Sequence, residues 1–327
     1  MNPRYKWFAG GLIILFFCIS PAIFRSDFYL HVFILVFFNI IFCLSLYLLM
    51  SMGLVSLAQA GFVGIGAYTS ALLVLRLNLP FILCLFAAGI ACMLLSFAVG
   101  IVILRVKEVY FVLVTFALNE FISLIFTNWV SLFGGVSGIT NIPPPCFPIP
   151  FTGRLVIINS RISFYYFLFL ITLIVLIIVS RIMRSEFGRV FKMISDSELL
   201  AESTGVNLFY FRIFGFSVGA FFCGIGGSLF AHYSGYISPQ YFSGWTSFDY
   251  LVITVVGGMG SVIGPVLGSF VITSIPELLR GLKEIQLILY GIILVVVVMF
   301  LPKGLVFFID VLKEKVFKDQ KIEGRAV

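Results

Sequence analysis

Long runs of uncharged apolar residues dominate this sequence of 327 residues. The clearest cover residues 7–24, 81–104, 162–180 and 285–301, close to the length of about 20 residues that crosses a hydrocarbon core of about 30 Å. Only 11% of the residues are charged, compared with about 25% in a typical soluble domain. The runs do not alternate between polar and apolar residues as the strands of a membrane β-barrel do. The sequence therefore predicts an all-α, polytopic membrane protein.

The charges predict the topology of a single transmembrane domain over residues 1–327. We predict about ten spans, at 7–24, 31–50, 60–75, 80–104, 109–128, 162–180, 212–231, 246–262, 265–280 and 285–301. With both termini cytoplasmic, 15 of the 21 basic residues lie on the inner side, as the positive-inside rule requires. This places the polar loop 181–212 in the cytoplasm and the Gly- and Pro-rich loop 129–161 outside. The basic tail 303–327 is then cytoplasmic, where we expect anionic membrane lipid to attract it.

Two glycine-rich segments are expected to interrupt the regular helices. Segment 51–72 has four glycines, and segment 257–268 has five. Non-helical backbone at membrane depth must be buried in protein or line a cavity, and interruptions in both halves of a chain indicate a transporter core with internal repeats. Tight helix packing is the alternative for the row Gly260, Gly264 and Gly268. The candidate residues of a translocation path are Ser56, Gln59, Gly61, Gly64, Glu120, Gly257, Gly258 and Gly260.

Three ionisable residues lie in or beside the apolar runs. Glu120 is in the middle of span 109–128, next to Asn119, and a carboxylate at this depth normally faces a partner or a watery cavity. Two roles stay open for it: part of a substrate path, or a contact that locks helices together. Asp249 and His232 lie near predicted span boundaries, which favours interfacial positions, and a substrate or gate contact is the alternative for His232.

The loop 181–212 contains a helix signal. Ser195 and Glu198 have the spacing of a capping box, acidic residues follow in the first turn, and Gly205 suits the position after the last turn. The pattern predicts a helix over 196–204. A helix shorter than about 12 residues is marginal in water, so we expect it to dock on a cytoplasmic subunit; a solvated connector is the alternative. The candidate docking residues are Ser195, Asp196, Glu198, Leu199, Ala201, Glu202 and Gly205.

Five blocks of the sequence carry a resemblance to a known family. They are 53–68 (GLVSLAQAGFVGIGAY), 110–139, 188–205, 231–265 and 301–305. In this order they resemble the permease subunits of branched-chain amino-acid ABC transporters, the Liv type, and most closely the M subunit. Ala58 departs from the glycine usual in the family, which replaces one small residue by another.

The resemblance implies an importer assembled from several chains. Two cytoplasmic ATPases would bind ATP and Mg and drive alternating access, a sibling permease would complete the pathway, and an extracytoplasmic substrate-binding protein would deliver the substrate. The sequence has no nucleotide-binding G-x-x-x-x-G-K-[ST] motif and no metal cluster, so we expect no enzyme activity and no catalytic, cofactor or metal site in this chain. Nucleic acid is not an expected partner, because the net charge of +7 follows the topology. The alternatives are a single-chain ion-coupled secondary transporter or channel and, within the family, a permease for urea or short amides.

Overall fold

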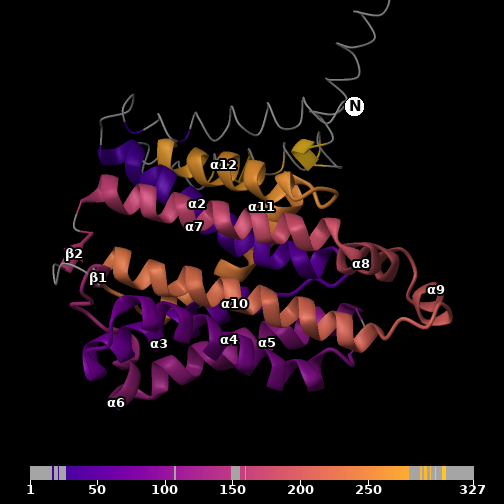
Figure 1. The fold of residues 1–327 in the computed structure, drawn as a ribbon, viewed down its shortest axis with the longest axis horizontal. Coiled ribbons are helices and arrows are strands. Elements are labelled where there is room, and N and C mark those ends of the chain that lie inside the picture. Colours follow the sequence, from indigo (N-terminus) through magenta and orange to yellow (C-terminus); the bar gives the residue numbers. More distant parts are fainter. Residues whose placement is uncertain are drawn as a thin grey trace, which may run out of the picture.

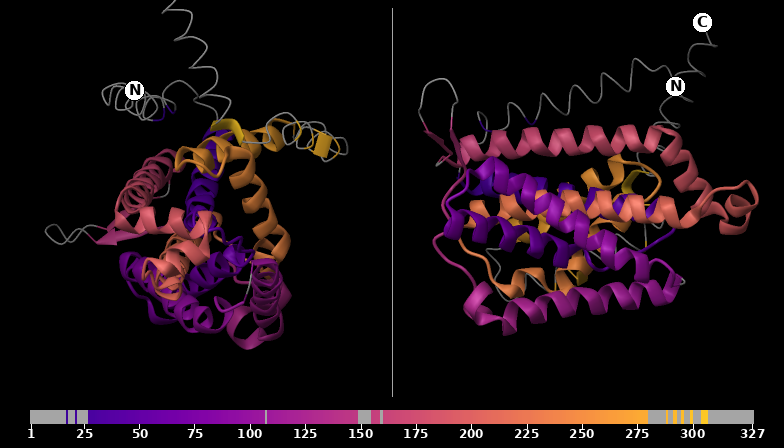
Figure 2. Two further views of the ribbon diagram at one scale, coloured as in Figure 1. Left: turned by 90° about the vertical axis from the view of Figure 1, so that its right-hand side faces the viewer. Right: turned by 60° about the horizontal axis from the view of Figure 1, so that its bottom comes forward.

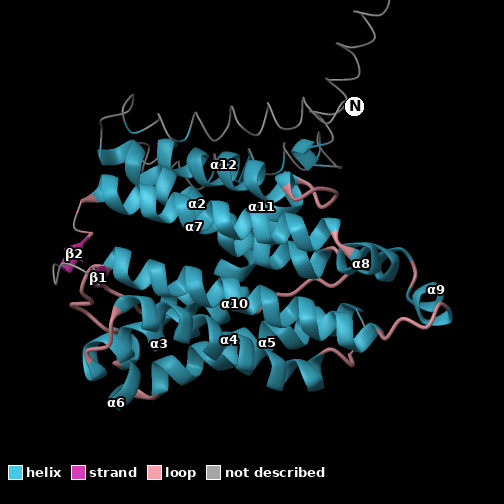
Figure 3. Ribbon diagram, in the orientation of Figure 1, coloured by secondary structure: helices cyan, strands magenta, loops and turns pink. Residues whose placement is uncertain are grey.

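The computed structural model describes residues 27–106, 108–148, 155–158, 160–279 and 304–306, and the single positions 17, 21, 288, 291, 292, 295 and 299. Nearly all of the described chain is helical, as Figure 3 shows, and this confirms the predicted all-α class. The predicted spans 7–24 and 285–301 and the tail 303–327 lie wholly or largely outside the described residues.

Six of the described helices are long and apolar enough to cross a membrane. They are α2 (Asp27–Met50), α3 (Gln59–Leu77), α4 (Phe81–Ile103), α5 (Glu108–Asn128), α7 (Arg161–Arg184) and α10 (Leu208–Ser234). Each coincides with one predicted span. The predicted spans 246–262 and 265–280 correspond to shorter helices, α11 (Gly244–Gly257) and α12 (Ile263–Leu278), of 14 and 16 residues. By length, the described residues thus provide six spanning helices rather than ten.

The long helices lie side by side along one axis, and short elements lie at both ends of the bundle (Figures 1 and 2). Helices α8 (Glu186–Asp196) and α9 (Glu198–Ser203) lie at one end, which we call the charged end. The other end, the hairpin end, carries α6 (Val130–Phe133) and a two-stranded antiparallel sheet. Its strands are β1 (Cys146–Pro148) and β2 (Leu155–Ile157); the remaining elements are the 3-10 turns η1 (Gly135–Ser137) and η2 (Pro239–Phe242).

Helices α2 and α10 form the core. In the most apolar 18-residue stretch of each helix, 89% of the residues of α2 and 78% of those of α10 are buried, compared with about a third or less in α4, α5 and α7. Glycines allow α3 and α10 to pack with their backbones close together. A Cβ atom on Gly66 would lie 2.3 Å from the carbonyl oxygen of Gly224, and one on Gly227 would lie 2.0 Å from that of Val63. No side chain fits there, so this helix pair requires glycine.

Candidate functional site

The chain is not helical between α2 and α3, although it is buried there. Ser56 and Ala58 are fully buried, and the backbone of residues 54–57 forms no regular element. Side chains of other helices satisfy amides along this stretch: the Leu57 N–H donates to Thr115 Oγ1 at 3.1 Å and the Ala60 N–H to Ser247 Oγ at 2.8 Å. The predicted interruption of segment 51–72 is therefore present, and it is buried in protein, as non-helical backbone in a membrane must be.

Asn119 is the centre of this polar network. It is fully buried, and it lies about halfway along the 21 residues of α5. Its Oδ1 accepts from the Gly61 N–H at 2.5 Å and from Ser247 Oγ at 3.2 Å, and its Nδ2 donates to the carbonyl of Phe242 at 3.0 Å. One side chain therefore joins the start of α3 to the residues that precede and begin α11.

Glu120 holds the first turn of α11. Its Oε1 accepts from the N–H of Gly244, the first residue of that helix, at 2.7 Å. A negative charge is favourable at a helix N-terminus, because the first N–H groups lack partners within the helix. The structure thus places Glu120 in a contact that locks two helices together, one of the two predicted roles. The other role, in a substrate path, stays a prediction.

Helices α3 and α11 enter this centre from opposite ends of the bundle. The segment that leads to α3 starts at the charged end, where Gly53 packs against Ser195 of α8. The segment that leads to α11 starts at the hairpin end, where Ile237 forms an antiparallel bridge with Ile139. The two helices therefore begin near the middle of α5 and run in opposite directions away from it. Helices whose N-termini converge at membrane depth are typical of transporter cores with inverted repeats.

The other predicted path residues separate into two groups. Ser56, Gln59, Gly61 and Gly64 are buried near the centre; Ser56 Oγ donates to Gln59 Oε1 at 3.0 Å, and Gly64 packs tightly against Phe126 and Phe242. Gly257, Gly258 and Gly260 lie at the far end of α11, about 20 Å from its start at a rise of about 1.5 Å per residue.

The predicted glycine row needs a correction at one position. Among the described residues, none apart from its chain neighbours has an atom within 4 Å of a Cβ placed on Gly260, so this residue makes no close approach to them. Gly257 takes its place, since its Cβ would lie 2.0 Å from the carbonyl oxygen of Gly264. A Cβ on Gly268 would lie 2.1 Å from the Ile253 carbonyl oxygen. The row that brings α11 and α12 together is therefore 257, 264 and 268, because Gly260 lies in the exposed turn between the helices.

The polar residues that the sequence reasoning missed are Thr115 and Ser247. Thr115 precedes Asn119 by four residues, a spacing that puts both side chains on one face of a helix. This spacing could have indicated from the sequence that Thr115 and Asn119 act together. Nothing local in the sequence connects Ser247 with Asn119, because the two are 128 residues apart and meet only through the tertiary fold.

His232 lies in the last turn of α10, near the hairpin end, and its side chain is only 4% exposed. Its ring contacts Ser70 Oγ through Nε2 at 2.9 Å and the carbonyl of Pro143 through Nδ1 at 2.7 Å. Since a carbonyl only accepts, Nδ1 carries the proton in this arrangement and Nε2 accepts from Ser70. His232 therefore fastens the loop at the hairpin end to the bundle.

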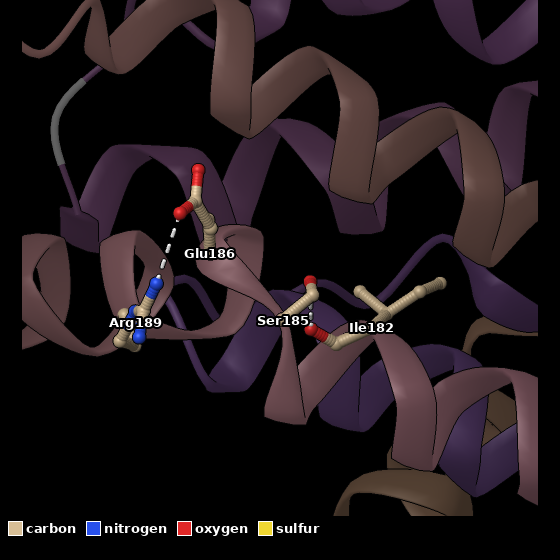
Figure 4. Close-up of polar contacts among 4 residues, drawn as sticks. All are labelled: Ile182, Ser185, Glu186 and Arg189. Atoms are coloured by element: carbon tan, nitrogen blue, oxygen red, sulfur yellow. Dashed lines mark hydrogen bonds and ion pairs between the residues drawn. The ribbon is translucent and has the colours of Figure 1, made fainter.

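The second candidate site is the pair of short helices at the charged end. Ser185 lies between α7 and α8, and its Oγ donates to the carbonyl of Ile182 in α7 at 2.6 Å. In the first turn of α8, Glu186 pairs with Arg189 at 3.1 Å (Figure 4). On the inner side of α8, Phe191 and Ile194 are buried, which holds this helix against the bundle.

The helix predicted over 196–204 is shorter than expected and has a different cap. Ser195 and Asp196 belong to α8, whose buried Ile194 keeps the helix continuous up to that point. The N-cap of α9 is Ser197, whose Oγ accepts from the Leu200 N–H at 3.3 Å. The predicted box between Ser195 and Glu198 is therefore wrong. Gly205 has φ of +82° just beyond α9, which agrees with its predicted place after the last turn.

Helix α9 presents apolar side chains outward. Leu199 is 81% exposed and Leu200 is 61% exposed, whereas Ala201 is buried in a small cluster with Ile194 and Leu208. Glu198 forms an ion pair with Arg212 of α10, which is only 12% exposed at its side chain. This pair and the small cluster fix a helix of six residues that would be marginal alone.

We expect Arg212→Gln to release α9 from α10. Losing this pair should cost roughly 1–2 kcal/mol locally, less than a fully buried pair would, because Glu198 is 44% exposed. Amide hydrogen exchange in residues 198–204 measures the effect, and the double variant Glu198→Arg/Arg212→Glu should partly restore protection. Arg189→Gln is the matched control, since it removes an exposed ion pair of α8. Equal exchange in Arg212→Gln and wild type would contradict this role.

Comparison with known proteins identifies the family. The family model described as "Branched-chain amino acid transport system / permease component" matches residues 28–298. The chain belongs to this permease family. A high-affinity branched-chain amino acid transport system permease protein, LivM of Escherichia coli, is 30% identical over 270 residues, which cover 77% of this chain and 64% of LivM. The chain thus spans slightly less than two thirds of that relative.

More distant relatives are also transport permeases. The probable LivM of Methanocaldococcus jannaschii is 23% identical over 245 residues, or 68% of each chain. An autoinducer 2 import system permease protein, LsrC of Yersinia pestis, is 31% identical over 105 residues, or 31% of this chain and 30% of LsrC. No solved structure matches. The family and the apolar helices together make this chain a multi-pass membrane permease.

Proposed function

We propose that the chain is the membrane-spanning subunit of an ABC importer for branched-chain amino acids, and that it is not itself an enzyme. The exposed surface of α9 is the observation that supports this most strongly. Exposure of Leu199 and Leu200 to water does not stabilise the folded chain. An apolar surface on a short, anchored helix suits contact with a protein partner. In this proposal α9 docks on one of two cytoplasmic ATPases, which bind ATP and Mg.

The proposed transport mechanism is alternating access about the polar centre. The inverted arrangement of α3 and α11 supports internal repeats, and motion of one half against the other would open the centre to each side in turn. We propose ten spans over residues 1–327, with α11 and α12 as half-length spans and both termini cytoplasmic. The excess of basic residues at the charged end supports this orientation. A sibling permease and an extracytoplasmic substrate-binding protein complete the assembly.

Two other functions remain as alternatives that experiment can separate. A single-chain, ion-coupled transporter or channel would account for the converging helices α3 and α11 and for Glu120. It would leave the apolar surface of α9 without a role. A permease for urea or short amides would use the same fold. The names of the LivM relatives, which cover most of this chain, favour branched-chain amino acids.

Co-purification tests the proposal. We expect the wild-type chain, expressed with its candidate ATPases and sibling permease, to retain the ATPases in mild detergent. Leu199→Arg/Glu202→Arg should abolish their retention without affecting membrane insertion, because it puts two cations into the proposed contact. Val136→Arg is the control, because Val136 is 63% exposed at the hairpin end. Failure of the wild type to retain any ATPase would favour the single-chain transporter.

A further inference from the structure

A cavity of about 420 Å³ lies among α3, α4, α5 and α6, which gather on one side of the bundle (Figure 1). Helix α3 supplies five of the eleven lining residues, from Ile65 to Leu73. These two residues are about 12 Å apart along the helix at a rise of about 1.5 Å per residue. Pockets that bind small molecules have volumes of about 300–1,000 Å³, so this cavity is large enough to hold part of a ligand.

The lining of this cavity favours an apolar occupant. Nine of its eleven side chains are apolar, and the other two are those of Tyr68 and Thr69. A buried water molecule typically makes about three hydrogen bonds, whereas apolar cavities of about 150 Å³ stay dry and bind apolar molecules. Water therefore finds too few partners here, and an apolar group fits the lining better.

The cavity opens on a side of the bundle that suits lipid. Leu95 of α4 belongs to the lining and is 38% exposed. The exposed positions of α4 from Ile82 to Val102 are all apolar, and so are those of α5 from Leu113 to Leu124. Lipid tails solvate such surfaces as well as protein does. An acyl chain of a membrane lipid therefore has direct access to the cavity.

Arg76 lies at the hairpin end of the cavity. It follows the lining residue Leu72 by four positions, which puts both on one face of α3. Its Nη2 donates to the carbonyls of Ser131 at 2.9 Å and Leu132 at 3.4 Å, both in α6. Within the described residues no carboxylate pairs with Arg76, which is exposed. Its positive charge is therefore available to an anion.

The depth of Arg76 matches that of lipid headgroups. Trp129, between α5 and α6, is 55% exposed and precedes Ser131 by two residues. Tryptophan is enriched at the level of the headgroups on both sides of a membrane. The guanidinium that binds the Ser131 carbonyl therefore lies close to the level of lipid phosphates, and guanidinium groups match phosphate geometry.

Tyr68 adds a hydrogen-bond donor to the cavity. Its ring packs against two other lining residues, with centroid distances of 4.3 Å to Phe126 and 5.2 Å to Phe133. The Tyr68 hydroxyl is buried and has no hydrogen-bond partner in the part of the chain that the structure describes. A buried donor without a partner is costly, so an occupant that carries an acceptor oxygen is favoured over a plain hydrocarbon.

We propose that this cavity is a specific site for one phospholipid. Its phosphate binds Arg76, one acyl chain fills the space between α3, α4 and α5, and an ester oxygen accepts from the Tyr68 hydroxyl. The lipid thereby joins α6 and the ends of α3 and α5 at the hairpin end. This site does not depend on the proposed importer function, which ATPase co-purification tests separately.

Photocross-linking tests the position of the lipid. The probe is phosphatidylglycerol with a photoreactive group in one acyl chain, in nanodiscs that contain the full chain. Residues 65–73 and 122–133 should be labelled several-fold more than residues 170–178 of α7, whose exposed positions are also apolar. Arg76→Gln should remove this excess. Arg161→Gln is the matched control and should keep it, because Arg161 lies at the same end of the bundle but at the start of α7.

A second probe separates the phosphate contact from the apolar contact. Diacylglycerol with the same photoreactive chain lacks the phosphate and should label the cavity no more than α7. Equal labelling of the cavity by both probes would refute the contact with Arg76. If phosphatidylglycerol also labelled the cavity no more than α7, the lipid there would be ordinary solvent of the membrane surface. Loss of the excess on addition of a second permease chain would mean that this chain occupies the cavity instead.

Thermal unfolding provides an independent readout. A ligand that binds only the folded state raises the unfolding temperature by mass action. Phosphatidylglycerol added to the delipidated chain in detergent should raise this temperature by several degrees, and inorganic phosphate alone should not. The shift should be smaller in Arg76→Gln and in Tyr68→Phe, and unchanged in Arg161→Gln. No shift in the wild type, or an equal shift in all four proteins, would contradict the site.

Discussion

Asn119→Leu is expected to abolish uptake and to lower the free energy of unfolding by about 2–5 kcal/mol. Leucine has the same branched arrangement of heavy atoms as asparagine and is larger, so it leaves no cavity, and the effect comes from the lost hydrogen bonds together with crowding. The Gly61 N–H and the Phe242 carbonyl would both lose their side-chain partner in a site that is closed to water. Because Asn119 joins the starts of α3 and α11, the N-termini of both helices should lose their fixed positions together. Thermal unfolding in nanodiscs and uptake into proteoliposomes measure the two effects.

Asn128→Leu is the control for this prediction. It is the same exchange on the same helix, but Asn128 is exposed at the end of α5, and its Nδ2 donates to the Leu124 carbonyl of its own helix at 2.9 Å. A surface change of this kind should stay within about 0.5 kcal/mol of wild type. If Asn119→Leu were equally mild, the polar centre around Asn119 would not hold α3 and α11 in place, which would contradict the proposal that alternating access occurs about this centre.

The membrane class and six long helices could be predicted from the sequence, because apolar length alone decides them. The interruption before α3 was also predictable, since polar residues such as Ser56 and Gln59 and a high glycine content disfavour a regular membrane helix. The depth at which α3 and α11 begin was not predictable. It depends on hydrogen bonds that Asn119 and Glu120 accept from residues more than 50 positions away, which no local pattern encodes.

The two serines at the charged end show why the capping prediction failed. Both Ser195 and Ser197 are followed by residues that suit a first helical turn, so the local signal was ambiguous. Burial of Phe191 and Ile194 decided between them, because it extends α8 through Ser195 and leaves Ser197 as the first residue free to take an extended conformation. The docking role assigned to this region depends on exposure of Leu199, which a sequence pattern does not measure.

Gly264→Ala is expected to be among the most damaging single-methyl additions in this chain. The new Cβ would lie 1.9 Å from the carbonyl oxygen of Gly258, where α12 crosses the end of α11. Overpacking of a core typically costs about 1–3 kcal/mol, and this contact should reach about 3 kcal/mol or more, because the obstacle is backbone and no rotamer change can relieve it. Separation of the two helices should also reduce the amount of folded protein in the membrane and the temperature of thermal unfolding.

Gly260→Ala separates this prediction from the one made on sequence spacing alone. Gly260 lies four residues before Gly264 in the same glycine-rich segment, yet in the part of the chain that the structure describes no atom beyond its chain neighbours lies within 4 Å of its Cβ position, and its φ is not in the left-handed region. Alanine there should leave folding and uptake unchanged. If Gly260→Ala were instead as damaging as Gly264→Ala, the packing row would be 260, 264 and 268, and α11 and α12 would have to meet on a different face from the one through Gly257.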